Sequence, residues 1–336
     1  MHKERINSVN IIGGGMWGLA LAATMQRNDI NVQLFCHSIQ NTSVRIHEYC
    51  NDITFSLLHL GKLKGKVGNT LNFIVLPAQT IRAFISEYKE EYDENSGIVI
   101  CSKGIEKDTG LFLSEIISEE IGLKVPLGVL AGPNFSIDVL NGIHTSTTIS
   151  STDLNLKKNT LKVLSSNSFT LEESNDLIGS QLCSALKNIY AIGAGFTYFQ
   201  YIREKYGIEN IAKAENAIRD NLIDYSNLLA SFLTDSFREF REIFKALCDI
   251  EHIDTTFNYC GIGDFLLSCS SSKSRNFQLG YHTGLSTLNY KPSYNREIHL
   301  SEGYFSIQGL INRMLKYDIE YKKYKILNSI VELMAF

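Results

Sequence analysis

Gly13-Gly14-Gly15-Met16-Trp17-Gly18 is the stretch that decides the fold of this chain. The β-branched residues of 9–12 predict a strand before it, and the apolar residues of 17–25 recur at helical spacing after it. This strand-to-helix turn is the context that a G-x-G-x-x-G pattern needs to bind a dinucleotide, with a ligand-free glycine turn as the alternative. In such a site the first glycine allows the tight turn, the second lets the backbone approach a pyrophosphate, and the third lets helix and strand pack closely. The residues expected to contact the dinucleotide here are Gly13, Gly15, Met16, Trp17 and Gly18.

Length and composition indicate a globular protein of two ordinary domains, because the chain has 336 residues and 44% of them are hydrophobic. The net charge is -4, and no basic face or acidic tail suggests a nucleic acid as partner. The start of the chain leaves no room for a signal peptide before the first strand. The most apolar later run, residues 189–199, is too short for a bilayer, so no membrane insertion is expected.

The seven cysteines are scattered and odd in number, and none forms a C-x-x-C pair. This distribution is typical of reduced thiols in a cytosolic protein and suggests neither a metal site nor redox chemistry. We therefore expect a cytoplasmic protein without a metal.

Strand and helix patterns alternate through the first half of the chain, which predicts a mostly parallel, doubly wound α/β sheet. Residues 39–70 are polar and poorly periodic, and they receive no assignment. After residue 176 the apolar residues recur at helical spacing, so the expected domains are 1–175, a Rossmann-like dinucleotide-binding domain, and 176–336, an all-helical domain for substrate and catalysis. The expected strands after the first are 32–35, 72–76, 97–101, 127–130, 145–149 and 168–171.

The second strand ends in Phe35-Cys36-His37-Ser38, where NAD-binding folds usually carry a carboxylate for the adenosine ribose. Without that carboxylate, nothing in this segment repels a 2′-phosphate. His37 is therefore a candidate cofactor ligand, NADP(H) is favoured and NAD(H) stays compatible. The alternative for His37 is an ordinary surface loop.

Two later strands deliver polar residues to the same edge of the sheet, the edge where open α/β folds bind ligands. Lys103 follows one strand and could meet a phosphate or a carbonyl, although a solvated loop lysine is equally compatible. Gly132 and Asn134 follow the next strand. Gly132 would let a ligand approach the backbone, whereas Asn134 could be no more than a helix cap.

Lys187 is placed in an apolar helical stretch, in the segment Ala185-Leu186-Lys187-Asn188. Burying an ammonium without a partner is costly, so this side chain either reaches solvent or is held there for a reason.

Seven motifs taken together resemble the NAD(P)-dependent glycerol-3-phosphate dehydrogenase family of the bacterial type. Each motif alone is weak, but they occur in the family's order and span nearly the whole chain. They are the glycine turn with Trp17, Lys103-Gly104, Ala131-Gly132-Pro133, Ala185 to Asn188, Gly261-Ile262-Gly263-Asp264, Ser274-Arg275-Asn276 and Glu302-Gly303.

The resemblance implies roles for individual residues. Lys187 matches the catalytic lysine, Asp264 lies close to it in the family, and a guanidinium fork such as that of Arg275 suits phosphate geometry. Without the resemblance, Asp264 would be a loop aspartate and residues 274–276 an ordinary helix start. The implied substrate ligands are Lys103, Gly132, Asn134, Lys187, Asp264, Ser274, Arg275 and Asn276. The cofactor ligands implied beyond the glycine turn are His37, Lys103, Ser136, Arg275, Leu300 and Glu302, and Arg219 has a supporting role.

The chain also departs from the family pattern. Met16 replaces the usual serine of the glycine turn, and residues 196–212 replace a segment that is usually rich in glycine. These changes could alter affinity or assembly.

The resemblance implies reversible reduction of dihydroxyacetone phosphate to sn-glycerol 3-phosphate with NAD(P)H, a product that feeds glycerophospholipid synthesis, and it is compatible with a homodimer. Two alternatives stay open. One is a related dehydrogenase of 2-hydroxy acids, and the other is a diverged nucleotide-binding protein without activity.

Overall fold

The computed structural model describes residues 9–50, 55–65, 67–68, 70–122, 124–207, 226–287 and 301–335. It divides into two compact units. The sheet unit comprises Met1–Lys103 and Phe112–Ser180, and the helical unit comprises Gly104–Leu111 and Gln181–Phe336. The domain limits expected from the sequence, 1–175 and 176–336, did not anticipate that the short segment after Lys103 groups with the helical unit.

The sheet unit contains one sheet of eight strands in the order β3-β2-β1-β4-β5-β6-β7-β8. Neighbouring strands are parallel except β6 and β7, which pair antiparallel. The predicted doubly wound α/β sheet is therefore confirmed. The strands are β1 Val9–Ile12, β2 Val32–Cys36, β3 Ser56–His59, β4 Leu71–Ile74, β5 Gly97–Ile100, β6 Leu127–Ala131, β7 Thr145–Ser150 and β8 Phe169–Ser174.

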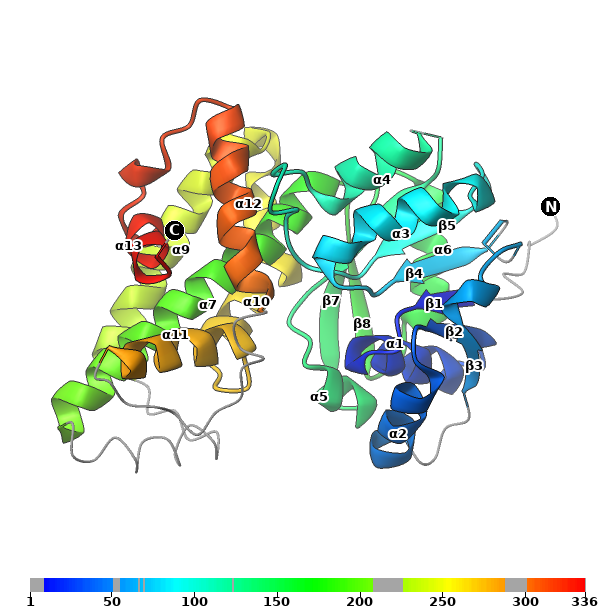
Figure 1. Cartoon of the computed structure of the whole chain (residues 1–336), viewed down its shortest axis with the longest axis horizontal. Helices are drawn as coiled ribbons and strands as arrows, with labels where there is room; N and C mark the ends of the chain where they lie inside the picture. Colours follow the sequence, from blue (N-terminus) through cyan, green and yellow to red (C-terminus); the bar gives the residue numbers. More distant parts are fainter. Residues whose placement is uncertain are drawn as a thin grey trace. The chain divides into compact units, whose positions relative to one another are not determined.

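Helices cover both faces of this sheet (Figure 1). Helix α1 packs against α5 and α6, and α3 packs against α4. Side chains of α1, α5 and α6 form a continuous apolar core with those of β1, β2 and β4. The helices are α1 Met16–Arg27, α2 Ile39–Tyr49, α3 Ile81–Tyr88, α4 Leu113–Ile121, α5 Ser136–Leu140 and α6 Leu154–Leu164, with short 3-10 turns η1 Leu60–Lys62, η2 Ala78–Thr80 and η3 Lys89–Glu91.

The segment 39–70, for which the sequence pattern predicted no element, contains α2, the edge strand β3 and η1. Ser38 caps α2 by accepting a hydrogen bond from the backbone N–H of Asn41 at 3.2 Å. Only Thr42 of this helix is buried, so the apolar periodicity that reveals a core helix is weak. Strand β3 pairs with β2 alone, which explains why its residues are not a continuous apolar run.

The helical unit is built around the long helix α7, Leu177–Tyr206, whose residues from Leu182 to Ala194 are nearly all buried. A side chain at Gly195 would overlap the carbonyl oxygen of Phe277, and one at Gly280 would overlap that of Ile192, so α7 and α11 cross in backbone contact. The remaining described elements are α9 Asn227–Leu247, η5 Ile250–Phe257, η6 Tyr259–Gly263, α10 Asp264–Cys269, α11 Arg275–Ser286, α12 Glu302–Lys316, η8 Tyr321–Lys323 and α13 Lys325–Leu333.

Residues 196–212 are the segment that differs from the family pattern, and the structure describes them as far as residue 207. As far as Tyr206 they continue helix α7. Its aromatic rings pack on α11, with ring centroids 5.7 Å apart for Tyr198 and Phe277 and 6.1 Å apart for Phe199 and Tyr281. The aromatic residues in this segment therefore strengthen the contact between helices α7 and α11.

The state of the cysteines and the hydropathy of the helices were both predicted from composition. All seven cysteines are free thiols. Within the described residues, no helix has both the length and the apolar character needed to cross a membrane.

Candidate active site

The glycine turn lies at the carboxyl end of β1, where the chain order reverses. Strand β1 pairs with β2 on one side and with β4 on the other, which makes this a topological switch point. Gly13 has φ +131°, a conformation that favours glycine, and its N–H donates to the carbonyl of Phe35 at 2.8 Å. Gly15 is the exposed N-cap of α1, so the first N–H groups of that helix point to open space in front of it.

Lys103 and Gly132 are brought together at the ends of β5 and β6. The Nζ atom of Lys103 donates to the carbonyl oxygen of Gly132 at 3.0 Å. A Cβ atom at Gly132 would lie 2.5 Å from Oγ1 of Thr147. Strand β7 is therefore a close neighbour that by itself requires glycine at this position.

Asn134 is not the helix cap that the sequence allowed. Helix α5 begins at Ser136 with Phe135 as its N-cap. The Nδ2 atom of Asn134 instead donates to Oγ1 of Thr145 at 2.6 Å and to the carbonyl of Ser146 at 3.3 Å. Asn134 thus fastens the turn after β6 to strand β7.

Lys187 is buried in the helical unit beside a carboxylate. Its Nζ atom lies 3.2 Å from Oδ1 of Asp264 and donates to Oγ of Ser268 at 2.8 Å. Lys187 is 8% exposed and Asp264 is 1% exposed, so the ammonium does not extend into solvent. Among the two readings of this lysine, the structure supports a side chain held in place by partners.

A single π-helical turn, Tyr259–Gly263, delivers Asp264 to the start of α10. Such turns are rare and often occur at functional sites. Ser268 follows Asp264 by four residues, so both side chains lie on one face of α10, and the Ser268 hydroxyl is 3.4 Å from Oδ1 of Asp264. Sequence reasoning missed Ser268, although its spacing from Asp264 was a usable signal.

Cys269 also approaches this cluster, with its Sγ atom 3.8 Å from the carbonyl of Lys187. Burial raises the pKa of the Cys269 thiol far above its ordinary value, against the opposing effect of the Lys187 ammonium. The thiol is therefore protonated at neutral pH and is not a nucleophile.

Asn276 links three helices, and we call its contacts the asparagine lock. Its Nδ2 atom donates to Oδ1 of Asn188 on α7 at 2.8 Å, and its Oδ1 atom accepts from the N–H of Gly303 on α12 at 3.1 Å. Each member of the lock is the chain neighbour of a candidate residue: Lys187, Arg275 and Glu302. The lock therefore fixes the backbone positions of these three candidates relative to one another.

Replacing Gly303 with alanine is expected to break the asparagine lock. The added Cβ atom would lie 2.5 Å from Oδ1 of Asn276 and 2.8 Å from the carbonyl of Asn188. Overpacking of this kind costs about 1–3 kcal/mol, so the midpoint of thermal unfolding should fall. Lys316→Ala, at an exposed position of the same helix, is the control that should leave it unchanged. An unchanged midpoint in Gly303→Ala would show that the lock does not stabilise the unit.

The other predicted residues of the helical unit lie at helix starts. Ser274 caps α11 by accepting from the N–H of Phe277 at 3.4 Å, and the exposed Arg275 is the first residue of that helix. Glu302 is the first residue of α12. Leu300 and Arg219 lie outside the described residues.

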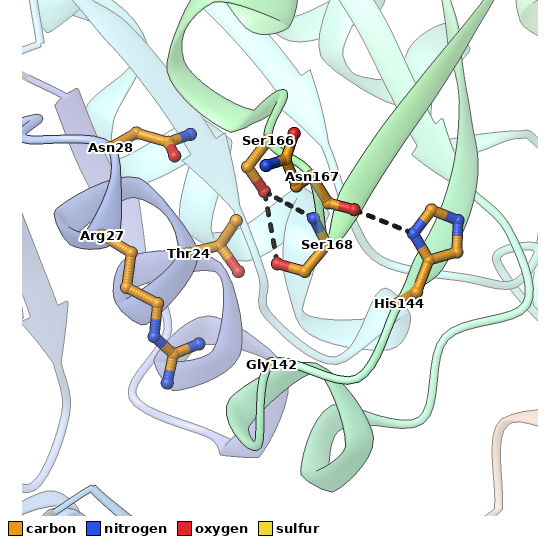
Figure 2. A pocket seen from close by; sticks show the side chains of 8 residues that line it. All are labelled: Thr24, Arg27, Asn28, Gly142, His144, Ser166, Asn167 and Ser168. Carbon is orange, nitrogen blue, oxygen red and sulfur yellow. Dashed lines mark hydrogen bonds between the residues drawn. The ribbon is translucent and has the colours of Figure 1, made fainter.

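A polar hollow of about 400 Å³ lies in the sheet unit at the opposite end of α1 from the glycine turn (Figure 2). Arg27 borders it, but two nitrogens of its guanidinium donate to the carbonyls of Val139 and Leu140 at 3.3 and 2.5 Å. Arg27 thus stabilises the last turn of α5. The hollow is separate from the strand ends that carry the candidate residues, and it is lined by Thr24, Arg27, Asn28, Gly142, His144, Ser166, Asn167 and Ser168.

A glycine turn at the switch point of a parallel sheet, with a helical second unit, defines the class of Rossmann-type nicotinamide-dependent oxidoreductases. Two family models identify the particular family. The model for the N-terminus of NAD-dependent glycerol-3-phosphate dehydrogenase matches residues 8–157, and the model for its C-terminus matches residues 176–335. The chain therefore belongs to the NAD-dependent glycerol-3-phosphate dehydrogenase family.

Individual relatives agree with this membership. The chain is 32% identical over 292 residues to a glycerol-3-phosphate dehydrogenase [NAD(P)+] of Mesorhizobium japonicum, a match that covers 82% of this chain and 75% of the relative. The crystal structure of a glycerol-3-phosphate dehydrogenase from Coxiella burnetii shares the fold with a TM-score of 0.72, 21% identity and 98% coverage of both chains. A D-mandelate dehydrogenase matches with a TM-score of 0.56 at 12% identity, covering 98% of this chain and 97% of its own. Because both family models and the relative at 32% identity are glycerol-3-phosphate dehydrogenases, the alternative of a 2-hydroxy acid dehydrogenase is not favoured.

Proposed function

We propose that this chain reduces dihydroxyacetone phosphate to sn-glycerol 3-phosphate with NADPH or NADH, and catalyses the reverse reaction. The observation that carries the proposal is the buried contact of Lys187 with Asp264. A protein that only bound a nucleotide would have no need of a proton donor in this place. The relatives' names support the substrate and both cofactors.

The residues of the glycine turn fit a dinucleotide. A Cβ atom at Gly15 would meet no atom within 4 Å, which leaves space for a pyrophosphate against the first N–H groups of α1. Backbone amides make this contact, so Met16 can replace the family's serine without removing the site. When bound, the nicotinamide supplies a hydride to the C2 carbonyl of the substrate.

Lys187 supplies the proton that the reduction requires. Its Nζ–H polarises the C2 carbonyl oxygen and passes a proton to that oxygen as negative charge develops there. Asp264 and Ser268 hold the Nζ atom of Lys187 in place, at 3.2 Å from the carboxylate oxygen and 2.8 Å from the hydroxyl oxygen. In the reverse direction the neutral amine accepts the proton from the C2 hydroxyl.

Arg275→Ala is expected to raise the KM for dihydroxyacetone phosphate about 10- to 100-fold, because a hydrogen bond to a charged group contributes about 1.5–3 kcal/mol. The exposed guanidinium can be removed without opening a cavity in the fold. Steady-state kinetics with dihydroxyacetone phosphate and with a 2-keto acid as substrates measure the effect. A similar loss on both substrates would contradict a phosphate-binding role for Arg275.

The activity itself is tested with purified protein, dihydroxyacetone phosphate and either reduced nicotinamide cofactor. Loss of absorbance of the reduced nicotinamide, together with formation of sn-glycerol 3-phosphate, is the expected result. If dinucleotide binds but neither cofactor is oxidised, the chain is a binding protein and the proposed activity is wrong.

A cytoplasmic location and a homodimer also remain proposals for this chain. The seven free thiols support a reducing compartment. Light scattering of the purified protein measures the oligomeric state.

A further inference from the structure

We infer that Arg313 is a positioning residue for Lys103, and that it acts through the segment Gly104–Leu111, which we call the strap. The inference rests on the proposed function, because it concerns the binding of the substrate by Lys103. Arg313 was not a candidate from the sequence. It lies in the last turn of α12, whereas the candidate Glu302 begins that helix.

The strap is the part of the chain that follows Lys103 directly. Lys103 groups with the sheet unit, and the strap groups with the helical unit. Gly104 has φ +138°, a backbone conformation that favours glycine, at the junction between the two. A single peptide bond therefore joins Lys103 to a segment whose contacts belong to the helical unit.

Internal hydrogen bonds make the strap a compact loop. The N–H of Glu106 donates to the carbonyl of Leu111 at 3.0 Å, and the N–H of Gly110 donates to the carbonyl of Glu106 at 2.9 Å. The hydroxyl of Thr109 donates to Oε2 of Glu106 at 2.5 Å. Because these bonds connect the two ends of the loop, a contact at Gly110 also restrains the end next to Lys103.

Arg313 fastens the strap to α12. Its NH1 atom donates to the carbonyl oxygen of Gly110 at 3.1 Å, and the residue is 3% exposed. A Cβ atom at Gly110 would lie only 2.6 Å from the backbone nitrogen of Arg313, so the strap and the helix meet at backbone distance. Loss of one partner of a buried charged hydrogen bond is costly, which makes this contact a firm anchor.

Two further residues of α12 contact the strap, which lies beside this helix (Figure 1). The Nδ2 atom of Asn312 donates to the carbonyl of Lys107 at 2.7 Å. A Cβ atom at Gly309 would lie 2.9 Å from the carbonyl oxygen of Glu106. Gly309 and Arg313 are four residues apart, so they lie on one face of the helix. This face of α12 therefore holds the strap at several points.

Lys103 is thus restrained from two directions. Its Nζ atom donates to the carbonyl of Gly132 in the sheet unit, and its backbone continues into the strap. The helix that holds the strap also carries Gly303, a member of the asparagine lock. Release of the strap from Arg313 should therefore change the backbone position of Lys103 and weaken its contact with the substrate.

The test is a double-mutant cycle on the KM for dihydroxyacetone phosphate at saturating NADPH. Lys103→Ala should raise KM about 10- to 100-fold, the range for a lost hydrogen bond to a charged group. Arg313→Met, which keeps a long unbranched side chain, should raise KM about threefold or more with kcat unchanged. In the Lys103→Ala background Arg313→Met should raise KM no further, because the residue that it positions is gone.

Three other variants separate positioning from stability. Arg313→Lys keeps a charged donor and should restore part of the wild-type KM. Asn312→Ala removes a half-buried contact with the strap, should raise KM in the same direction, and replaces Arg313→Met in the cycle if that variant does not fold. Lys316→Ala, at an exposed position of the same helix, should leave KM unchanged.

Hydrogen exchange measures the anchoring of the strap without an activity assay. The amides of residues 104–111 should exchange faster in Arg313→Met than in the wild type, whereas those of β5 should exchange at the wild-type rate. Unchanged exchange in the strap would show that Arg313 does not anchor it, and this result would overturn the inference.

Two kinetic outcomes would also overturn the inference. One is additive effects of Lys103→Ala and Arg313→Met on KM, and the other is a wild-type KM in Arg313→Met together with a lowered unfolding midpoint. A wild type without turnover would refute the proposed activity instead, and the cycle is then measured by calorimetry as dissociation constants of sn-glycerol 3-phosphate. Non-additive constants would leave the inference standing, whereas additive constants, or no binding by the wild type, would refute it as well.

Discussion

Lys187→Met is expected to lower kcat for the reduction of dihydroxyacetone phosphate about 100- to 10,000-fold, the range for loss of a general acid. Methionine keeps the length of the side chain but has no proton to give to the C2 oxygen. Dinucleotide affinity should be unchanged, because the glycine turn belongs to the sheet unit whereas Lys187 belongs to the helical unit. Steady-state kinetics and a titration with NADPH measure the two quantities separately.

The same substitution leaves Asp264 buried without its cation. Removing one partner of a buried ion pair destabilises a protein by about 3–5 kcal/mol, so lost activity alone could reflect lost structure. The double variant Lys187→Met/Asp264→Asn removes both charges and should recover the unfolding midpoint without recovering turnover. Turnover restored with stability would contradict a chemical role for Lys187, and so would wild-type turnover in the single variant.

The parts of the fold that the sequence predicted are those specified by local patterns. Continuous apolar runs such as residues 97–101 correspond to buried strands within a residue or two, and the glycine turn lies between β1 and α1 as expected. Burial from both sides makes such strands uniformly apolar, which is why they can be recognised without a structure. Helix α2, which buries only Thr42, and the edge strand β3 lack this pattern and were not predicted.

The sequence predicted several residues of the candidate site, but not most of the contacts that hold them in place. Lys187 and Asp264 were paired through the family resemblance, and the structure brings their side chains together. Ser268 and the asparagine lock depend on contacts between residues 27 to 88 positions apart, and no local pattern encodes these. The helix cap that short-range rules allowed as the alternative for Asn134 does not form, because its side chain makes a tertiary hydrogen bond to Thr145 instead.

Gly18→Ala and Gly15→Ala are expected to have opposite effects, although both lie in one turn. A Cβ atom at Gly18 would overlap the carbonyl oxygen of Gly13, which is backbone and cannot move aside. We expect Gly18→Ala to destabilise the sheet unit by about 3 kcal/mol or more. Gly15 has extended backbone angles that any residue adopts, and a Cβ atom there would meet no protein atom within 4 Å. Gly15→Ala should therefore keep the wild-type unfolding midpoint.

The space in front of Gly15 is the space that a pyrophosphate needs, so Gly15→Ala should weaken dinucleotide binding at least about tenfold, equivalent to about 1.4 kcal/mol. Trp17 provides the measurement, because it is the only tryptophan of the chain and lies half-buried in the first turn of α1. Its fluorescence, titrated with NADP+, reports the dissociation constant of wild type and variant. Wild-type affinity in Gly15→Ala would place the pyrophosphate elsewhere, because methyl and phosphate cannot share this position.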